Sequence, residues 1–195
     1  MRVTGGSLGG RRLAAAPRGV RPSADRVREA LFARLPGLED GAGWKVLDLY
    51  AGTGSLGIEA LSRGAGRAVF VERSRAAVAV LRRNLAALGL EARSRVLAVD
   101  ARSAARRLAA ERERFRLVLA DPPYADPGWG EALASLVAAD VLEREAVVVV
   151  ERGRRHSLPD VPGLQTRDSR RYGDTILEWF EVGRALESHE GERQA

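Results

Sequence analysis

The chain of 195 residues contains no cysteine, one methionine and two histidines. The absence of cysteine excludes disulfides, thiolate metal sites and cysteine nucleophiles. No stretch is apolar over the length of a membrane span, and the N-terminus lacks the apolar core of a signal peptide. We therefore expect a cytoplasmic protein that uses no metal and contacts no membrane. The length and the hydrophobic fraction of 45% suit one well-packed domain with a small appendage.

Lysine is nearly absent, since Lys45 is the only one, and arginine carries the positive charge. The net charge of +6 and the pI near 10.7 indicate an anionic partner. Up to residue 28 the chain has seven arginines and one acid, Asp25. The seven are Arg2, Arg11, Arg12, Arg18, Arg21, Arg26 and Arg28, and a second group comprises Arg152, Arg154, Arg155, Arg167, Arg170 and Arg171.

The chain is predicted to have three parts. Glycines interrupt short apolar pieces in residues 1–22, which form a basic arm that is either a hairpin or mobile until it meets a partner. The main domain is expected over residues 23–186. Residues 187–195 are polar and are expected to be disordered.

A helix is predicted directly after the arm. Ser23 is expected to cap this helix, and Pro36 to end it. The face opposite its apolar stripe carries Arg26, Arg28 and Arg34. This face would add positive charge next to the arm.

The stretch from Val46 to Gly57 combines a buried strand with a glycine-rich turn. Its apolar beginning is typical of a parallel strand, and Gly52, Gly54 and Gly57 are spaced as in a tight turn that enters a helix. At such a turn backbone N–H groups face outward, and the missing side chains let a nucleotide-sized ligand approach the main chain. We interpret the turn as a ligand site; the alternative is a structural turn without a ligand.

From residue 45 onward strands and helices alternate, which predicts an α/β fold with a parallel sheet and helices on both of its faces. The last two expected strands, Thr166–Asp168 and Thr175–Val182, are joined by a turn at Tyr172 and predict an antiparallel finish. The preceding strands are expected at about 45–50, 68–72, 95–100, 116–121 and 147–150.

Four successive strands end in an acid. These acids are Asp48, Glu72, Asp100 and Asp121, and the carboxyl ends of parallel strands meet at one edge of the sheet. Like charges gathered there are unfavourable unless a cation or hydrogen-bond donors occupy the space. The alternative is that each acid caps the helix that follows it, as Asp100 is placed to do.

The ligand of this edge is expected to be S-adenosylmethionine. The glycine spacing, with Glu72 about 20 residues further on, also suits NAD. However, a pyrophosphate would face Asp48, and the turn has no lysine or arginine to compensate it. S-adenosylmethionine has no phosphate, and it offers ribose hydroxyls to Glu72, an adenine amine to Asp100 and an α-amino group to Asp48.

The sequence Asp121-Pro122-Pro123-Tyr124 forms the second half of the predicted site. The two prolines stiffen an extended chain that has no N–H groups, so the loop offers the Asp121 carboxylate and the Pro122 carbonyl as acceptors. Two fixed acceptors suit an exocyclic base amine with its two N–H donors. Tyr124 offers a flat face on which the base can stack, worth about 1 to 3 kcal/mol.

Together these motifs resemble the Rossmann-type S-adenosylmethionine-dependent methyltransferases that act on exocyclic amines. The segment Arg21–Phe32 (RPSADRVREALF) makes the resemblance closest to the RsmD-type bacterial enzymes, which methylate the N2 amine of a guanine in small-subunit (16S) ribosomal RNA. Further matching segments are Leu56–Ala65, Val69–Glu72 and Tyr172–Thr175, so the resemblance reaches about residue 182. Ser23 replaces the usual threonine and keeps the hydroxyl.

The resemblance implies a seven-stranded, mostly parallel sheet whose last strand is antiparallel. It implies target-base contacts at Asp121, Pro122 and Tyr124. Direct in-line transfer of the methyl group follows, with no metal and no covalent intermediate. The cofactor contacts that it implies are Asp48, Gly52, Thr53, Gly54, Glu72 and Asp100.

The RNA is expected to bind beside this site as a loop or an easily unstacked nucleotide, with a monomeric enzyme. Three other functions remain open: an adenine-N6 methyltransferase acting on RNA or DNA, an NAD-dependent oxidoreductase, and an RNA-binding assembly factor without activity. The residues predicted to hold phosphates are Arg11, Arg12, Arg21, Arg26 and Arg28.

Overall fold

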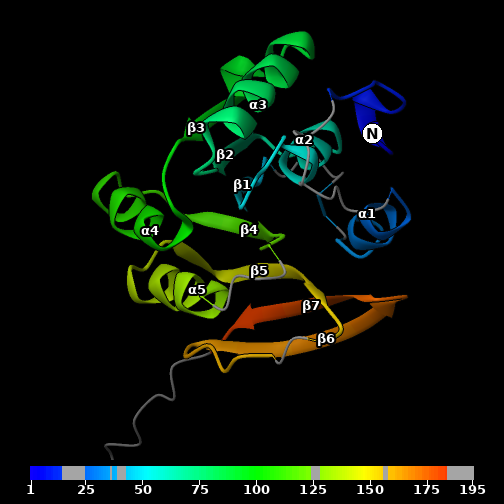
Figure 1. The fold of residues 1–195 in the computed structure, drawn as a ribbon. Coiled ribbons are helices and arrows are strands. Elements are labelled where there is room, and N and C mark those ends of the chain that lie inside the picture. The colour runs from blue at the N-terminus through cyan, green and yellow to red at the C-terminus, as the bar shows by residue number, and fades with distance from the viewer. Residues whose placement is uncertain (15–24, 36, 39–42, 124–127, 156–157, 184–195) are drawn as a thin grey trace, which may run out of the picture.

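A seven-stranded sheet forms the centre of the computed structural model, which describes residues 1–14, 25–35, 37–38, 43–123, 128–155 and 158–183. Its strand order is β3-β2-β1-β4-β5-β7-β6 (Figure 1). Neighbours from β3 to β5 run parallel, whereas β7 is antiparallel to both β5 and β6. The predicted sheet of seven strands with an antiparallel last strand is therefore confirmed. The strands are β1 (Lys45–Leu49), β2 (Arg67–Val71), β3 (Ser94–Leu97), β4 (Phe115–Ala120), β5 (Leu142–Gly153), β6 (Leu164–Tyr172) and β7 (Thr175–Val182).

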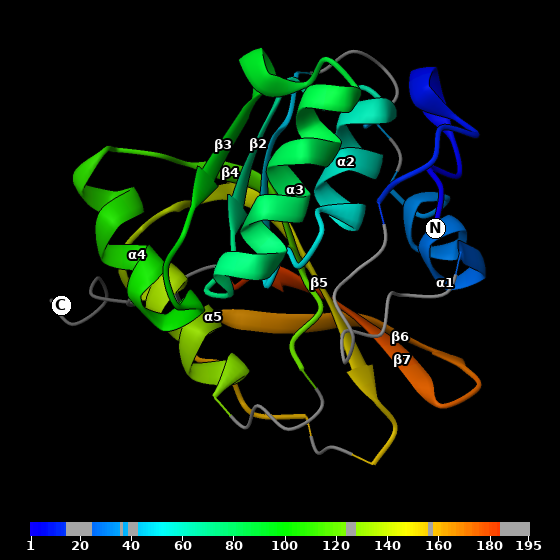
Figure 2. The same ribbon diagram turned by 45° about the horizontal axis from the view of Figure 1, so that its top comes forward.

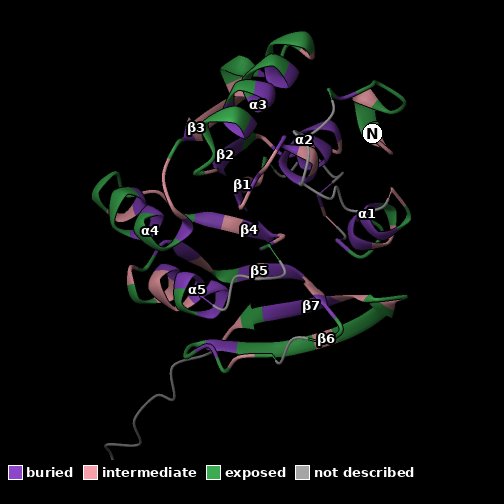
Figure 3. Ribbon diagram, in the orientation of Figure 1, coloured by how far each residue is buried: buried purple, intermediate pink, exposed green. Residues whose placement is uncertain are grey.

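Helices cover the two faces of the sheet, as Figures 1 and 2 show. Apolar residues of α1, α2 and α3 share one buried cluster with the sheet, and those of α4 and α5 share the other. The edge strand β6 stays exposed along most of its length (Figure 3). The helices are α1 (Asp25–Phe32), α2 (Ser55–Ser62), α3 (Arg75–Ala87), α4 (Ala101–Ala110) and α5 (Trp129–Ala138), with short 3-10 turns η1 (Gly6–Leu8) and η2 (Glu91–Arg93). None of the described helices has both the length and the apolar character that a bilayer crossing requires.

Capping residues set several helix boundaries where the sequence predicts them. Ser74 caps α3, because its hydroxyl accepts the Ala77 N–H at 3.3 Å. Gly64, with φ at 112°, follows the end of α2 in a conformation that favours glycine. Ser23 and Pro36, which were predicted to bound the first helix, lie outside the described residues.

Two strands extend further than the sequence predicts. Strand β5 covers Leu142–Gly153, whereas the sequence predicted a strand only over 147–150. The prediction missed the beginning of β5 because residues 143–145 are all charged and are not typical of a buried strand. A register shift between Phe115 and Leu117 of β4 accompanies this part of the pairing. Strand β6 is also longer than predicted. The prediction was too short because β6 lies at the exposed edge of the sheet, and its arginine-rich sequence lacks the alternation of apolar and polar residues that indicates a strand.

The N-terminal segment forms a short hairpin in which Arg2 and Arg12 pair antiparallel. Figures 1 and 2 both place it beside α1 and α2. The carboxylate of Glu59, on α2, accepts the backbone N–H groups of Thr4 and Gly5, each at 2.8 Å. The hairpin is thus fastened to the helix that follows the glycine turn. The rest of the predicted arm, residues 15–22, is outside the described part of the chain.

The prediction that Arg28 holds RNA phosphates from an exposed helix face is wrong. Its side chain is fully buried. The guanidinium lies 3.3 Å from the Glu59 carboxylate and 2.9 Å from that of Asp25, and it donates to the Arg2 carbonyl at 2.5 Å. Arg28 therefore joins the hairpin, α1 and α2 internally, and its charge is compensated by acids rather than by RNA.

Candidate functional site

The carboxyl ends of β1, β2 and β4 meet at one edge of the sheet. The chain runs outward from β1 to β2 and β3, and then returns to β4 on the other side of β1. Ligands of parallel α/β sheets bind at such a reversal of strand order. The pairing of Leu49 with Ala120 places Asp121, the next residue of β4's chain, beside Tyr50 and the glycine turn. The two predicted halves of the site are therefore adjacent.

The three glycines of the turn have different reasons to be glycine. A side chain on Gly52, which has φ at 55°, would meet nothing within 4 Å, so the main chain is open to a ligand there. A Cβ on Gly54 would lie 2.4 Å from the Leu81 side chain, and one on Gly57 2.3 Å from the Phe70 ring. The left-handed φ of 89° favours glycine at Gly54, packing against the Phe70 ring favours it at Gly57, and the open approach to the turn is at Gly52.

Glu72 directly follows β2 and braces the turn. One carboxylate oxygen accepts the Gly52 N–H at 2.8 Å, and the other accepts the Ser74 N–H at 2.7 Å. The carboxylate therefore connects the glycine turn to the beginning of α3. Each oxygen keeps a further lone pair, which can accept hydroxyl groups of a ligand.

Asp48 lies within β1 rather than at its end, and it is 1% exposed. Its carboxylate accepts the Gly57 N–H at 2.8 Å and so holds the beginning of α2. Burial raises the pKa of Asp48 to about 7, against the lowering effect of the Gly57 hydrogen bond, and the charge of Glu72 raises it further. A carboxyl group with this pKa is sensitive to any cation that approaches the turn.

We expect Asp48 to make the stability of the protein pH-dependent. Its pKa is about 7 in the folded state against 3.8 for an ordinary aspartate, so the folded state binds the extra proton between these values. The unfolding free energy should therefore fall as pH rises through this window, by about 1 kcal/mol per pH unit. Urea denaturation of the wild type and Asp48→Asn at pH 5, 6, 7 and 8 measures the difference. The unfolding free energy of the wild type minus that of Asp48→Asn should fall from pH 5 to pH 8, and a value that stays constant or rises over this range would contradict the assignment.

Asp100 caps α4, as the helix-cap alternative predicts. Its carboxylate accepts the Arg102 N–H at 3.0 Å, and it lies 3.4 Å from the Arg73 guanidinium. The hydrogen bond from the Arg102 backbone is the largest cause that holds the pKa of Asp100 below its usual value. Asp100 lies three residues beyond the end of β3, and its contact with an adenine amine stays a prediction.

The proline loop leaves the sheet at the end of β4. Asp121 is half-buried, Pro122 is buried and Pro123 is exposed. Tyr124, the predicted stacking residue, lies outside the described residues. Among the residues that the structure describes, no group of three or more acids or histidines could hold a metal ion.

Asn84 is a site residue that sequence reasoning missed. Its side-chain nitrogen donates to the Thr53 carbonyl of the glycine turn at 3.0 Å, and its oxygen accepts the Ala14 N–H at 2.8 Å. This asparagine on α3 therefore ties the turn to the end of the N-terminal hairpin. The signal in the sequence was an asparagine on the face of the predicted helix that otherwise carries apolar residues, where a polar side chain needs a hydrogen-bond partner.

Of the four other arginines that were predicted to bind phosphates, three are exposed and one lies outside the described residues. Arg11, Arg12 and Arg26 are exposed. Arg11 also donates to the Ala87 carbonyl at 3.4 Å, which holds it against the end of α3. Arg21 lies outside the described residues. Arg11, Arg12 and Arg26 therefore keep the exposure that a phosphate contact needs.

Comparisons with known proteins agree on one family. The family described as Conserved hypothetical protein 95 matches residues 1–181. Ribosomal RNA small subunit methyltransferase D of Escherichia coli K12 is 38% identical over 164 residues, which are 83% of this chain and 79% of that protein. The protein of the same name from Haemophilus influenzae is 31% identical over 153 residues, 77% of this chain and 78% of that one.

A solved structure shows the same fold over nearly the whole chain. It is that of a hypothetical protein from Thermus thermophilus, which matches with a TM-score of 0.80 and 32% identity. The match covers 93% of this chain and 99% of that one. The family match begins at residue 1, so it includes the N-terminal segment as well as the sheet strands up to residue 181.

Proposed function

This chain belongs to the family described as Conserved hypothetical protein 95, and on that premise we propose that it is an S-adenosylmethionine-dependent methyltransferase acting on the N2 amine of a guanine in small-subunit ribosomal RNA. The resemblance to RsmD-type enzymes is confirmed by relatives named ribosomal RNA small subunit methyltransferase D. The observation that carries the proposal is the adjacency of the glycine turn after β1 and the Asp121–Pro122 loop after β4.

The residues of the turn fit S-adenosylmethionine. The main chain at Gly52 is open, the acids around it suit a positively charged ligand, and residues 50–57 contain no lysine or arginine for a pyrophosphate. When bound, S-adenosylmethionine supplies an electrophilic methyl group on a positively charged sulfur. Glu72 would accept its ribose hydroxyls while still bracing the turn. Asp48 would favour its positive charge from below the turn.

The proline loop would hold the base amine for attack. The Asp121 carboxylate and the Pro122 carbonyl accept one N–H each, which turns the nitrogen lone pair toward the methyl group. As the nitrogen gains positive charge, both hydrogen bonds strengthen, so the loop favours the transition state over the ground state. Tyr124 would stack against the base. Catalysis then consists of orientation and electrostatic stabilisation by residues of this chain.

The RNA would approach from the side of the hairpin. Exposed Arg11, Arg12 and Arg26 would contact its phosphates, with Arg21 as a further candidate. Because a stacked guanine cannot reach the sheet edge, the target is an unstacked nucleotide of a loop. We place this reaction in the bacterial cytoplasm and assign it to the monomer.

Nucleoside analysis tests the proposal. The purified protein is incubated with methyl-labelled S-adenosylmethionine and unmodified small-subunit RNA, both naked and assembled with its proteins, and the RNA is then digested. Label in N2-methylguanosine is the expected result. Label in N6-methyladenosine would keep the chemistry and overturn the choice of base. The absence of label from both substrates, despite measured cofactor binding, would favour an inactive assembly factor.

A further inference from the structure

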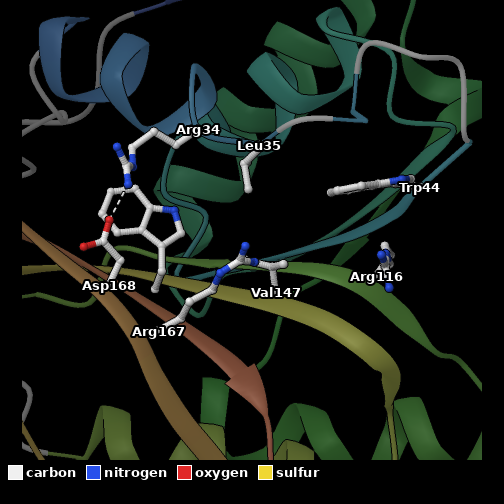
Figure 4. A pocket seen from close by; sticks show the side chains of 8 residues that line it. Arg34, Leu35, Trp44, Arg116, Val147, Arg167 and Asp168 are labelled. Carbon is white, nitrogen blue, oxygen red and sulfur yellow. Dashed lines mark hydrogen bonds and ion pairs between the residues drawn. The ribbon is translucent and has the colours of Figure 1, made fainter.

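A basic groove lies on the face of the sheet that α1 covers. It has a volume of about 270 Å³ and is lined by residues that follow α1 and by residues of several strands (Figure 4). Its polar and aromatic lining consists of Arg34, Trp44, Arg116, Arg167, Asp168 and Trp179, joined by two aliphatic side chains. None of these residues belongs to the predicted catalytic site.

The charge of the groove is positive. Its acid, Asp168, is already paired with both Arg34 and Arg170. Arg167 is exposed and has no hydrogen bond or ion pair with any of the described residues, so its guanidinium is available to an anion. Figure 4 shows that Arg167 reaches toward the middle of the groove. Arg116 is paired with the exposed Glu145 at 2.9 Å, so the uncompensated positive charge that an anionic ligand would meet in the groove is that of Arg167.

The groove also has aromatic walls. The guanidinium of Arg116 lies over the Trp44 ring and that of Arg34 over the Trp179 ring, each 5.4 Å from the ring centroid. The indole nitrogen of Trp179 is buried and has no hydrogen-bond partner among the described residues. Aromatic rings next to guanidinium groups are the combination that binds single-stranded nucleic acid, through base stacking and phosphate contacts.

The groove lies at the amino ends of the parallel strands, opposite the catalytic edge. Trp44 immediately precedes β1, and Arg116 is the second residue of β4. Asp121 is the fifth residue after Arg116, which is a distance of about 16 Å at ~3.3 Å per strand residue. An RNA strand whose target base lies at Asp121 can thus reach the groove within a few nucleotides.

We propose that this groove binds one single-stranded nucleotide of the substrate RNA, a few positions from the target guanine. Arg167 contacts a phosphate, Arg116 exchanges its exposed ion pair with Glu145 for a second phosphate contact, and the base lies against Trp44. The volume is close to the lower end, about 300 Å³, of pockets that take a small molecule, so it suits one nucleotide and excludes a duplex. The identity of the RNA rests on the proposed function, whereas the binding of a single strand does not.

Quenching of tryptophan fluorescence by a single-stranded 12-nucleotide RNA of mixed sequence tests the groove. Each arginine that contacts a phosphate contributes about 0.7 to the slope of log affinity against log salt. Arg167→Ala should therefore weaken binding about 5-fold at 0.1 M salt and lower the slope by about 0.7. Arg116→Ala/Arg167→Ala should weaken binding further, by about 5- to 20-fold in total, because Arg116 gives up its ion pair with Glu145 to contact a phosphate. Arg106→Ala, which removes an exposed arginine of α4 on the other face, is the matched control and should change affinity less than 2-fold.

Three results would overturn the groove as an RNA site. They are equal losses in Arg106→Ala and Arg167→Ala, no quenching of the wild type by the RNA, and quenching by a polyglutamate peptide instead, which would assign the groove to an acidic protein segment. The proposed function fails separately. RNA binding in the groove without methyl transfer overturns the function alone, and methyl transfer with unchanged affinity in the double variant overturns the groove alone.

Discussion

Asp121→Ala should lose roughly two to four powers of ten in the rate of methyl transfer and keep its affinity for S-adenosylmethionine. Cofactor affinity should be kept because Asp121 follows β4 and lies beside the glycine turn without being part of it. Removal of its carboxylate takes away one of two acceptors that strengthen as the base nitrogen gains charge. Single-turnover transfer with saturating cofactor measures the rate, and isothermal titration with S-adenosylhomocysteine measures the affinity.

Two further variants serve as controls for the Asp121→Ala measurement. Asp160→Ala removes an exposed acid from the loop after β5, and it should leave both rate and affinity unchanged. Asp121→Asn keeps an acceptor oxygen without the charge, so it should lie between the wild type and Asp121→Ala. Full activity of Asp121→Ala, or loss of cofactor binding with the rate, would remove Asp121 from the role assigned to it.

Glu59→Ala should lower the unfolding free energy by about 3 to 5 kcal/mol. Its buried carboxylate accepts five hydrogen bonds, and without it the charge of Arg28 stays buried beside an empty position. For a chain of this length, the melting temperature should fall on the order of 10 °C. The five donors are the Thr4 N–H, the Thr4 hydroxyl, the Gly5 N–H, the Arg28 Nε–H and the Arg63 Nε–H.

Calorimetry of a matched set of variants distinguishes the effect of removing the buried Glu59 carboxylate from the effect of removing an exposed acid. Glu29→Ala removes an exposed acid of α1 and should change stability by less than about 0.5 kcal/mol. Glu59→Leu/Arg28→Met removes both charges, so it should recover part of the loss although the hairpin contacts are gone. A melting temperature of Glu59→Ala within about 2 °C of the wild type would show that the hairpin does not depend on this carboxylate.

The order of elements and the edge that carries the site could be predicted because both depend on local patterns. Apolar runs such as Val69–Val71 and caps such as Ser74 give strands and helix ends from near neighbours in the sequence. The reversal at β1 then follows from the rules for parallel sheets. The beginning of β5 could not be predicted, because Glu143 and Glu145 are typical of a loop and lie where the register between β4 and β5 shifts.

The physical role of individual site residues was harder to predict than their position. Arg28 resembles a surface arginine by spacing, and its partners at Arg2 and at Glu59, 31 residues away, are distant in the sequence. Gly54 and Gly57 suggest ligand approach, yet the left-handed backbone at Gly54 and the Phe70 ring against Gly57 also favour glycine. These contacts join distant parts of the chain, so no local pattern reveals them.

The most direct test of the central claim is the number and position of methyl groups added to unmodified small-subunit RNA. Mass spectrometry of nuclease fragments, after reaction with the wild type and with Asp121→Ala, gives both. We predict one methyl group per RNA, on the N2 amine of a single guanine, and a rate for Asp121→Ala lower by at least about 100-fold. Methyl groups spread over many positions, or carried by another base, would contradict the account.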